Sequence, residues 1–204
     1  MTDAAEFIDA ALQAESSWQR QFEDPPGMPT GISHYGTSIG AVRGTVRDAL
    51  KRYRELGHDE LTALGSELWR APVFERRLAA VVLLQSVLPV LRGTDLTRIE
   101  GFLRSAEWSA LVDPLATDVI GPLVASLRGI EWARAEAVVD RWARETDPWL
   151  RRAAVLSPLR AIRAGAADPD RVARNSAAAL AIDESPIVAD AVAAVAAELA
   201  EPQR

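Results

Sequence analysis

One short segment places a tryptophan and a carboxylate close together near an expected helix boundary. It runs from Trp108 to Pro114, and its Trp108 and Asp113 are five positions apart. Because proline disfavours helical backbone in the residue before it, Asp113 is expected to leave helical geometry and to project its carboxylate from a helix end into a groove. The structural alternative is an N-cap, since Asp is a preferred capping residue directly before a proline in the first turn.

Arginine side chains form a second set of candidates. One helix face is expected to carry four cations, which are Arg43, Arg47, Lys51 and Arg54. Residues 141–174 hold eight arginines and no lysine against four acids. Guanidinium groups suit phosphate oxygens, but they serve equally in ion pairs between helices or on a solvated surface.

The segment from Asp147 to Ala154 contains a possible helix cap and two of these arginines. Asp147 can cap a helix, Trp149 can belong to the core, and Arg151 and Arg152 can be solvated. By itself the segment is typical of an ordinary helix start.

Most other kinds of site are excluded or poorly supported. The sequence has no cysteine, and its two histidines, His34 and His58, stand alone, so we expect no metal and no other cofactor. It also lacks the spacings typical of nucleotide-binding loops and hydrolase nucleophiles. The acid pairs at Asp59 and Asp183 fall at expected helix starts, where capping explains them.

Composition and charge indicate a globular helical protein. Of its 204 residues, 49% are hydrophobic but only 6% are aromatic, which favours helices. The net charge of −6 is uneven, since residues 1–33 carry −5, residues 183–204 carry −4 and the middle carries +3. A mildly basic middle permits DNA binding without requiring it. The acidic start and the interrupted apolar runs predict a cytoplasmic protein with no membrane partner.

Hydrophobic periodicity and helix-boundary signals predict an all-α chain. The expected helices span residues 2–22, 38–57, 58–70, 71–93, 95–104, 107–128, 130–145, 148–164, 169–182 and 186–200. Ser38 is the expected cap of the second, Gly57 its stop, and Pro158 a break in the eighth. Helix pairs of roughly 35 to 45 residues favour a single domain, residues 1–204, folded as a HEAT-like solenoid of stacked antiparallel helix pairs. An uneven bundle with a closed core is the alternative.

Several stretches together resemble the AlkD-like DNA alkylation repair family, in matching order. They are Tyr35–Arg43, Leu68-Trp69 with Glu75–Ala79, Glu107-Trp108 with Val112-Asp113, and Trp149–Ala154. The resemblance implies a HEAT-like solenoid that grips duplex DNA, including alkylated DNA, with a concave basic face. It also implies metal-independent hydrolysis of the glycosidic bond of N3- and N7-alkylated purines. By this resemblance Asp113 is the catalytic carboxylate, Trp108 belongs to an aromatic patch, and Arg152 holds a phosphate.

The chain departs from the family pattern at two aromatic positions. The family commonly has a second tryptophan where this chain has Ser109, and another where it has the stretch Asn175–Leu180. We therefore expect a bacterial DNA-binding repair protein whose glycosylase activity is weak or lost, with Arg43, Arg47, Arg151 and Arg152 contacting DNA. The alternative is a noncatalytic helical-repeat scaffold that binds a protein partner, which the net acidity and the missing rings favour.

Overall fold

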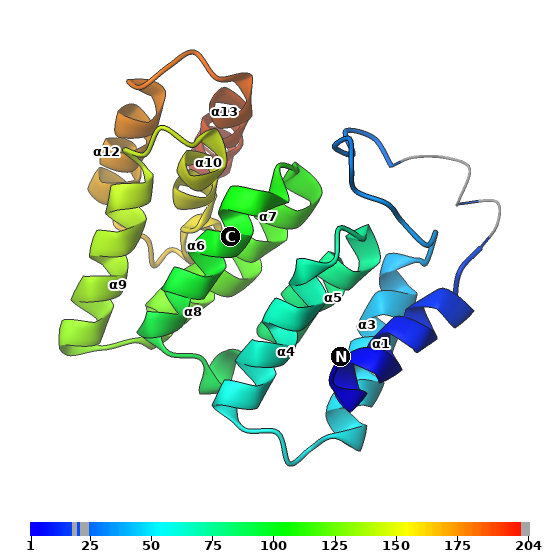
Figure 1. Cartoon of the computed structure of the whole chain (residues 1–204). Helices are drawn as coiled ribbons and strands as arrows, with labels where there is room; N and C mark the ends of the chain where they lie inside the picture. The colour runs from blue at the N-terminus through cyan, green and yellow to red at the C-terminus, as the bar shows by residue number, and fades with distance from the viewer. Residues whose placement is uncertain (18–19, 21–24, 201–204) are drawn as a thin grey trace. The chain divides into compact units, whose positions relative to one another are not determined.

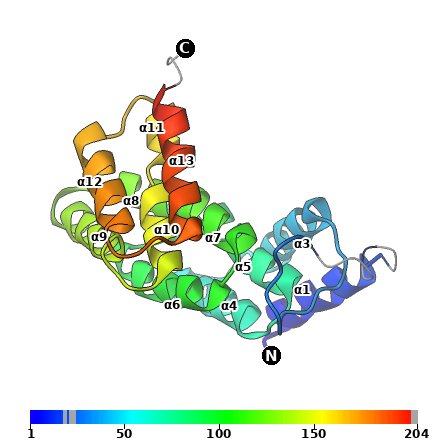
Figure 2. The same cartoon turned by 90° about the horizontal axis from the view of Figure 1, so that it is seen from above.

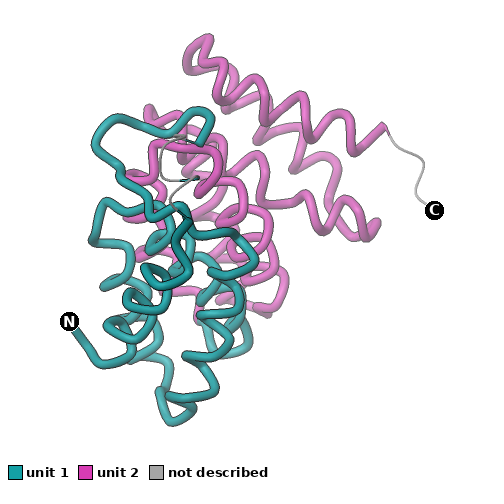
Figure 3. Tube along the Cα trace, turned by 90° about the vertical axis from the view of Figure 1, so that its right-hand side faces the viewer, with its two compact units in different colours: residues 1–91 teal, residues 92–204 magenta. Residues whose placement is uncertain are grey.

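The computed structural model describes residues 1–17, 20 and 25–200, and its regular structure is helical (Figure 1). Over these residues the strand-like pairing amounts to an isolated bridge between Ser33 and Val73. The predicted all-α class is therefore confirmed. The chain divides into two compact units, residues 1–91 and residues 92–204 (Figure 3). None of the helices described has both the length and the apolar character needed to cross a bilayer.

Within its described residues, the first unit has four helices that pack on one another. They are α1 (Asp3–Ala14), α3 (Ile39–Arg52), α4 (His58–Arg70) and α5 (Phe74–Ser86), with the 3-10 turn η1 (Leu88–Val90) behind them. α1 packs on α3, and both α3 and α4 pack on α5. The expected cap of α3 is confirmed, because the Ser38 hydroxyl accepts a hydrogen bond from the Ala41 N–H at 3.2 Å. The predicted bounds of α4 are confirmed too.

The other three helices described in this unit have boundaries that differ from the prediction. α1 ends at Ala14, well before residue 22, and Trp18, expected on its apolar stripe, lies outside the described residues. α3 ends at Arg52, and Gly57 instead precedes α4, where its N–H donates to the Glu60 carboxylate at 2.7 Å. α5 is shorter at both ends. The backbone before it pairs with Ser33, and Pro89 behind it cannot donate the N–H that a continuing helix needs.

A buried carboxylate ties the loop before α3 to α5. Glu75 is 1% exposed, and its two oxygens accept the backbone N–H groups of Tyr35 at 2.9 Å and Thr37 at 3.0 Å. The Tyr35 hydroxyl in turn donates to Asp9 on α1 at 2.8 Å. Two of the stretches that carry the family resemblance are thus in direct contact. Their role in this unit is to hold the loop in place.

The second unit is organised around α10 (Pro148–Leu156). Its other elements are η2 (Gly93–Asp95), α6 (Leu96–Ala106), α7 (Ser109–Leu115), η3 (Ala116–Ile120), α8 (Gly121–Ser126), α9 (Gly129–Trp142), α11 (Leu159–Arg163), α12 (Pro169–Leu180) and α13 (Pro186–Ala200). α10 packs against α6, α7, α9, α12 and α13, and Figure 2 shows it alongside α13. The side chains of Leu150, Ala153 and Ala154 at its centre are buried. The predicted break at Pro158 is confirmed, because α10 ends just before it and α11 begins just after it.

A π turn connects α7 to α8 in the predicted 107–128 helix. The Gly121 N–H bonds to the Ala116 carbonyl five residues earlier, so the helix widens just before Pro122, which has no N–H to donate. Gly121 also lies against the end of α10, where an added Cβ would sit 2.0 Å from the Ser157 carbonyl oxygen. Only glycine allows the two backbones to approach this closely.

Candidate active site

The second unit pairs Asp113 with Arg152. The carboxylate belongs to α7 and the guanidinium to α10. Arg152 Nε donates to Asp113 Oδ1 at 2.6 Å, and its Nη2 donates to Oδ2 at 2.7 Å. The Arg152 side chain is 12% exposed and that of Asp113 is 37% exposed. The structure therefore holds an oriented carboxylate that is partly exposed to solvent and accepts two hydrogen bonds from a bidentate guanidinium.

Asp113 lies inside α7, not at a helix end. The expectation that Pro114 would push it out of helical geometry is wrong, and so is the N-cap alternative, because the residue at the N-cap is Trp108. The Trp108 carbonyl accepts the N–H groups of Leu111 and Val112, so the first turn is closed before the proline is reached. Burial of Leu111, Val112 and Leu115 compensates for the hydrogen bond that Pro114 cannot make.

The two consecutive arginines of α10 form hydrogen bonds with residues at and around the connection between α12 and α13. Arg151 is fully buried, and it donates to the Ala179 carbonyl at 3.0 Å and to both oxygens of Asp183 at 2.9 and 2.7 Å. Arg152 Nη1 donates to the Ile187 carbonyl at the start of α13, at 2.7 Å. Hydrogen bonding from Arg151 holds the pKa of Asp183 below its ordinary value. Arg151, predicted to contact DNA, is thus placed where it joins α10 to the α12–α13 connection.

The aromatic residues near the pair have unequal access to solvent. Trp108 is 4% exposed, so little of its ring is open to a ligand. Ser109 is half-buried and lies four residues before Asp113, on the same face of α7. Trp149 is half-buried and lies one turn before Arg152 on α10, where Asp147 caps the helix by accepting the Trp149 N–H at 2.9 Å. The sequence allowed Trp149 to be a core residue, and its ring is in fact only half-buried.

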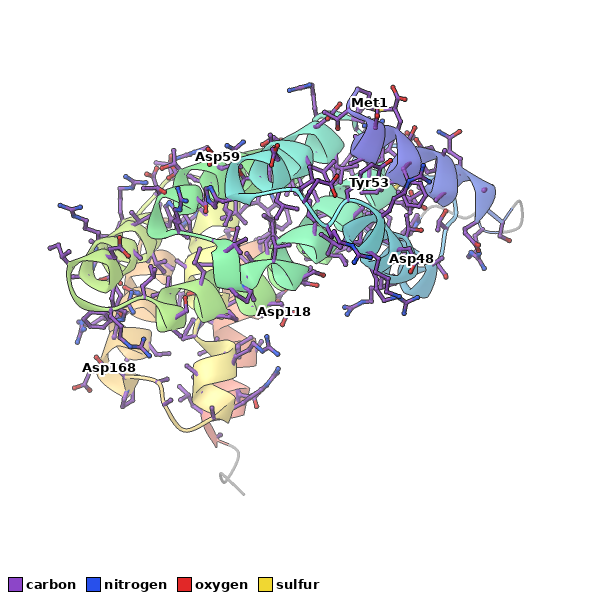
Figure 4. All side chains as sticks on the ribbon, turned by 90° about the horizontal axis from the view of Figure 1, so that it is seen from below. Met1, Asp48, Tyr53, Asp59, Asp118 and Asp168 are labelled. Atoms are coloured by element: carbon purple, nitrogen blue, oxygen red, sulfur yellow. The ribbon has the colours of Figure 1, made fainter. Side chains whose placement is uncertain are left out.

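The two other predicted DNA contacts belong to the first unit. Arg43 and Arg47 lie on the exposed face of α3, opposite the buried Val42 and Val46. The Arg47 side chain is 68% exposed, and its Nε lies 3.4 Å from Asp48 Oδ1, which is a long contact for an ion pair. Figure 4 marks Asp48 on this face of the unit. Both cations are therefore accessible on their own unit.

Most arginines of the region 141–174 are engaged with acids of the same unit. Arg141 pairs with Glu100 at 2.6 Å, Arg163 with Glu198 at 2.7 Å, and Arg171 with Glu136 and Asp140. These pairs account for much of the basic character seen in the sequence. Among the described residues, no three His, Asp or Glu side chains are grouped so that they could hold a metal ion.

The site residues fall within the span that a known family model covers. The model for the DNA alkylation repair enzyme family matches residues 8–203, which is nearly the whole chain. No curated protein matches the chain. A match of this extent shows that the chain belongs to the DNA alkylation repair enzyme family.

Proposed function

We propose that the chain binds duplex DNA carrying N3- or N7-alkylated purines and that its glycosylase activity is weak or lost. The reaction in question breaks the bond between C1′ of the sugar and the purine, and both electrons go to the base. An alkylated base is already cationic, so it leaves as a neutral molecule without being protonated first. The sugar becomes an oxocarbenium-like cation, which water attacks at C1′ with loss of a proton.

The observation that carries this proposal is the oriented carboxylate of Asp113. A fixed negative charge beside the sugar lowers the energy of the cationic transition state without any proton transfer. The fork of Arg152 fixes the orientation of the carboxylate, and the 37% exposed side chain can face a ligand. The same guanidinium also cancels part of its negative potential, which reduces the stabilisation that Asp113 can give.

The missing aromatic rings support weak activity. A serine at position 109, one turn from Asp113, offers no π face to a cation. The second expected ring falls in 175–180, where Asn175 is 7% exposed and donates instead to Asp140 at 2.8 Å. Each lost cation–π contact is worth about 1–2 kcal/mol, so together they lower the rate by at least about an order of magnitude.

The proposal includes a HEAT-like solenoid as the DNA-binding scaffold. Within the first unit, helices adjacent in sequence pack on each other, as α4 does on α5. In this reading α3 presents Arg43 and Arg47 to phosphates, while Arg151 supports the site from inside instead of touching DNA. Arg152 divides its donors among Asp113, Ile187 and a nearby phosphate.

A scaffold that binds a protein partner is the second candidate. The net charge of −6 and the acid-paired arginines of α9–α12 favour it, because both weaken attraction to phosphate. The two candidates differ in a simple measurement. Duplex binding should be detected at low ionic strength if the first is correct, whereas its absence there would leave the scaffold.

Base release tests the catalytic part. We expect slow release of 7-methylguanine from methylated duplex DNA, and a further fall with Asp113→Asn. Asp118→Asn is the matched control, because Asp118 is similarly exposed at 39% but meets Arg160 only at 3.8 Å; Figure 4 labels it. Equal release by wild type and Asp113→Asn, with both folded, would remove Asp113 from the mechanism. No release by wild type, with binding retained, would assign the chain to binding alone.

A further inference from the structure

The second unit contains a cavity of about 370 Å³ that the proposed DNA site does not use. Its walls come from α8, α9, the α10–α11 corner and α12, and neither Asp113 nor Arg152 lines it. Most of the lining is apolar, including the buried side chains of Val139, Val155 and Val172. The volume and the apolar lining are typical of a pocket for a small organic molecule.

Polar groups gather on one side of this cavity. Glu136 and Arg171 line it and form an ion pair, and Arg171 Nε also donates to Asp140 at 3.0 Å. Asn175 lines it too, and its side-chain amide donates to the same Asp140 oxygen at 2.8 Å. Two carboxylates therefore share one guanidinium. A third acid, Asp168, lines the cavity at the start of α12, where it accepts the N–H groups of Asp170 and Arg171 (Figure 4).

This arrangement leaves an excess of negative charge beside an apolar space. The capping contacts compensate Asp168, but Glu136 and Asp140 together carry two charges against the one on Arg171. The Glu136 side chain is 20% exposed, and burial raises its pKa despite the charge of Arg171. An additional cation in the cavity would relieve this imbalance, whereas an anion would add to it.

Trp132 supplies an aromatic face at the same place. It lines the cavity and is 43% exposed, so its ring lies where the cavity meets solvent. An exposed indole beside a carboxylate attracts flat cations through stacking and through the negative charge of the ring face. Ala154, Ala161 and Ala167 also line the cavity, and their small side chains leave room for a ring system.

We propose that this cavity binds a small organic monocation with a flat apolar body, its charge set toward Glu136 and its ring against Trp132. The apolar walls take up the ring, and the carboxylate pair provides selection by charge. The site is separate from the Asp113–Arg152 pair, so this binding does not depend on DNA binding or on base release.

Three probes of one shape and different charge test the class of ligand. Isothermal titration of the full chain would use 1-naphthylmethylamine as the cation, 1-naphthylmethanol as the neutral analogue and 1-naphthoate as the anion. We expect saturable binding of the amine, at least fivefold weaker binding of the alcohol and none of the acid. Equal affinities for the amine and the alcohol, or no binding of the amine at millimolar concentration, would overturn the proposal.

Variants then locate the binding site. Glu136→Gln should lower the affinity for the amine about tenfold and leave the affinity for the alcohol unchanged, because one nearby negative charge is lost. Glu131→Gln on the same helix is the control, because Glu131 is exposed and does not line the cavity. Ala161→Trp should abolish binding of both probes by filling the space. Thermal melting checks that each variant is folded, and amine binding that a folded Ala161→Trp retains would place the site elsewhere and refute the proposal.

Discussion

At the scale of single residues, the function of this chain depends on what surrounds Asp113. Its carboxylate is oriented by Arg152 and partly open to solvent, which suits electrostatic stabilisation of a cationic sugar. The neighbouring face of α7 carries a hydroxyl at Ser109 in place of an aromatic ring. The carboxylate is thus present while one of its expected partners is missing.

Replacing Ser109 with tryptophan should restore part of the activity. Ser109→Trp places an indole one turn from Asp113, and a cation–π contact of about 1–2 kcal/mol corresponds to about a tenfold faster release of 7-methylguanine. Single-turnover release from methylated duplex DNA measures the effect. Ser109→Leu is the control, because it adds bulk without a π face. An equal gain from leucine would attribute the change to packing.

Sequence and structure agree best where one residue determines a local conformation. The side chains of Ser38, Asp147 and Asp168 cap helices by accepting hydrogen bonds from backbone N–H groups two or three residues later. Such caps depend only on residues adjacent in the sequence, so they can be predicted from it. The pairing of Asp113 with Arg152 joins residues 39 apart and depends on how α7 packs on α10. The burial of Arg151 has the same origin. The sequence identifies these residues as candidates, but their spacing along the chain does not predict which partner each side chain will contact.

At the scale of helices, close packing of α8 on the end of α10 is set by Gly121. The π turn that precedes it was not predicted, because the sequence around Pro122 indicates an interruption without fixing its form. Once the turn is formed, the Gly121 backbone lies against the Ser157 carbonyl. The helix interruption and the helix contact are therefore one feature.

Gly121→Ala should destabilise the second unit. Its Cβ would lie 2.0 Å from the Ser157 oxygen, which is backbone and can move only with α10, so we expect a loss of about 2–3 kcal/mol in the free energy of unfolding. Chemical denaturation followed by circular dichroism measures it. Gly101→Ala in α6 is the control, since nothing lies within 4 Å of its added Cβ and alanine favours helix by about 0.5–1 kcal/mol. An unchanged stability of Gly121→Ala would contradict the close contact.

Glu100 joins α6 to α9 and should make stability depend on pH. Burial alone would raise its pKa, but hydrogen bonds from Trp142 and Arg104 and the charge of Arg141 hold the pKa below the ordinary 4.5. A depressed pKa stabilises the fold above the unfolded value and loses this effect as the pH falls through the folded value. The stability difference between wild type and Glu100→Gln should therefore be largest near neutral pH and shrink below about pH 4.5. A difference that stays constant down to pH 2 would contradict this assignment.

At the scale of the whole molecule, the distribution of charge decides between DNA and a protein partner. The net charge is −6, and the arginines that look most basic in the sequence are largely neutralised inside the second unit. The exposed cations of α3 are different, since Arg43 and Arg47 face solvent on the first unit. If the chain binds duplex DNA, these two side chains should contribute measurably to the electrostatic part of the free energy of binding.

The salt dependence of duplex binding measures that part. Each arginine that contacts a phosphate contributes about one unit to the slope of log K against log salt concentration, so Arg43→Gln with Arg47→Gln should reduce the slope by about two. Fluorescence anisotropy with a labelled duplex, measured at several salt concentrations between about 20 and 200 mM, gives the slope directly. Arg163→Gln is the control, because Arg163 is 57% exposed but already paired with Glu198 at 2.7 Å. An unchanged slope in the double variant would remove α3 from the interface, because a phosphate contact cannot be lost without releasing fewer counterions.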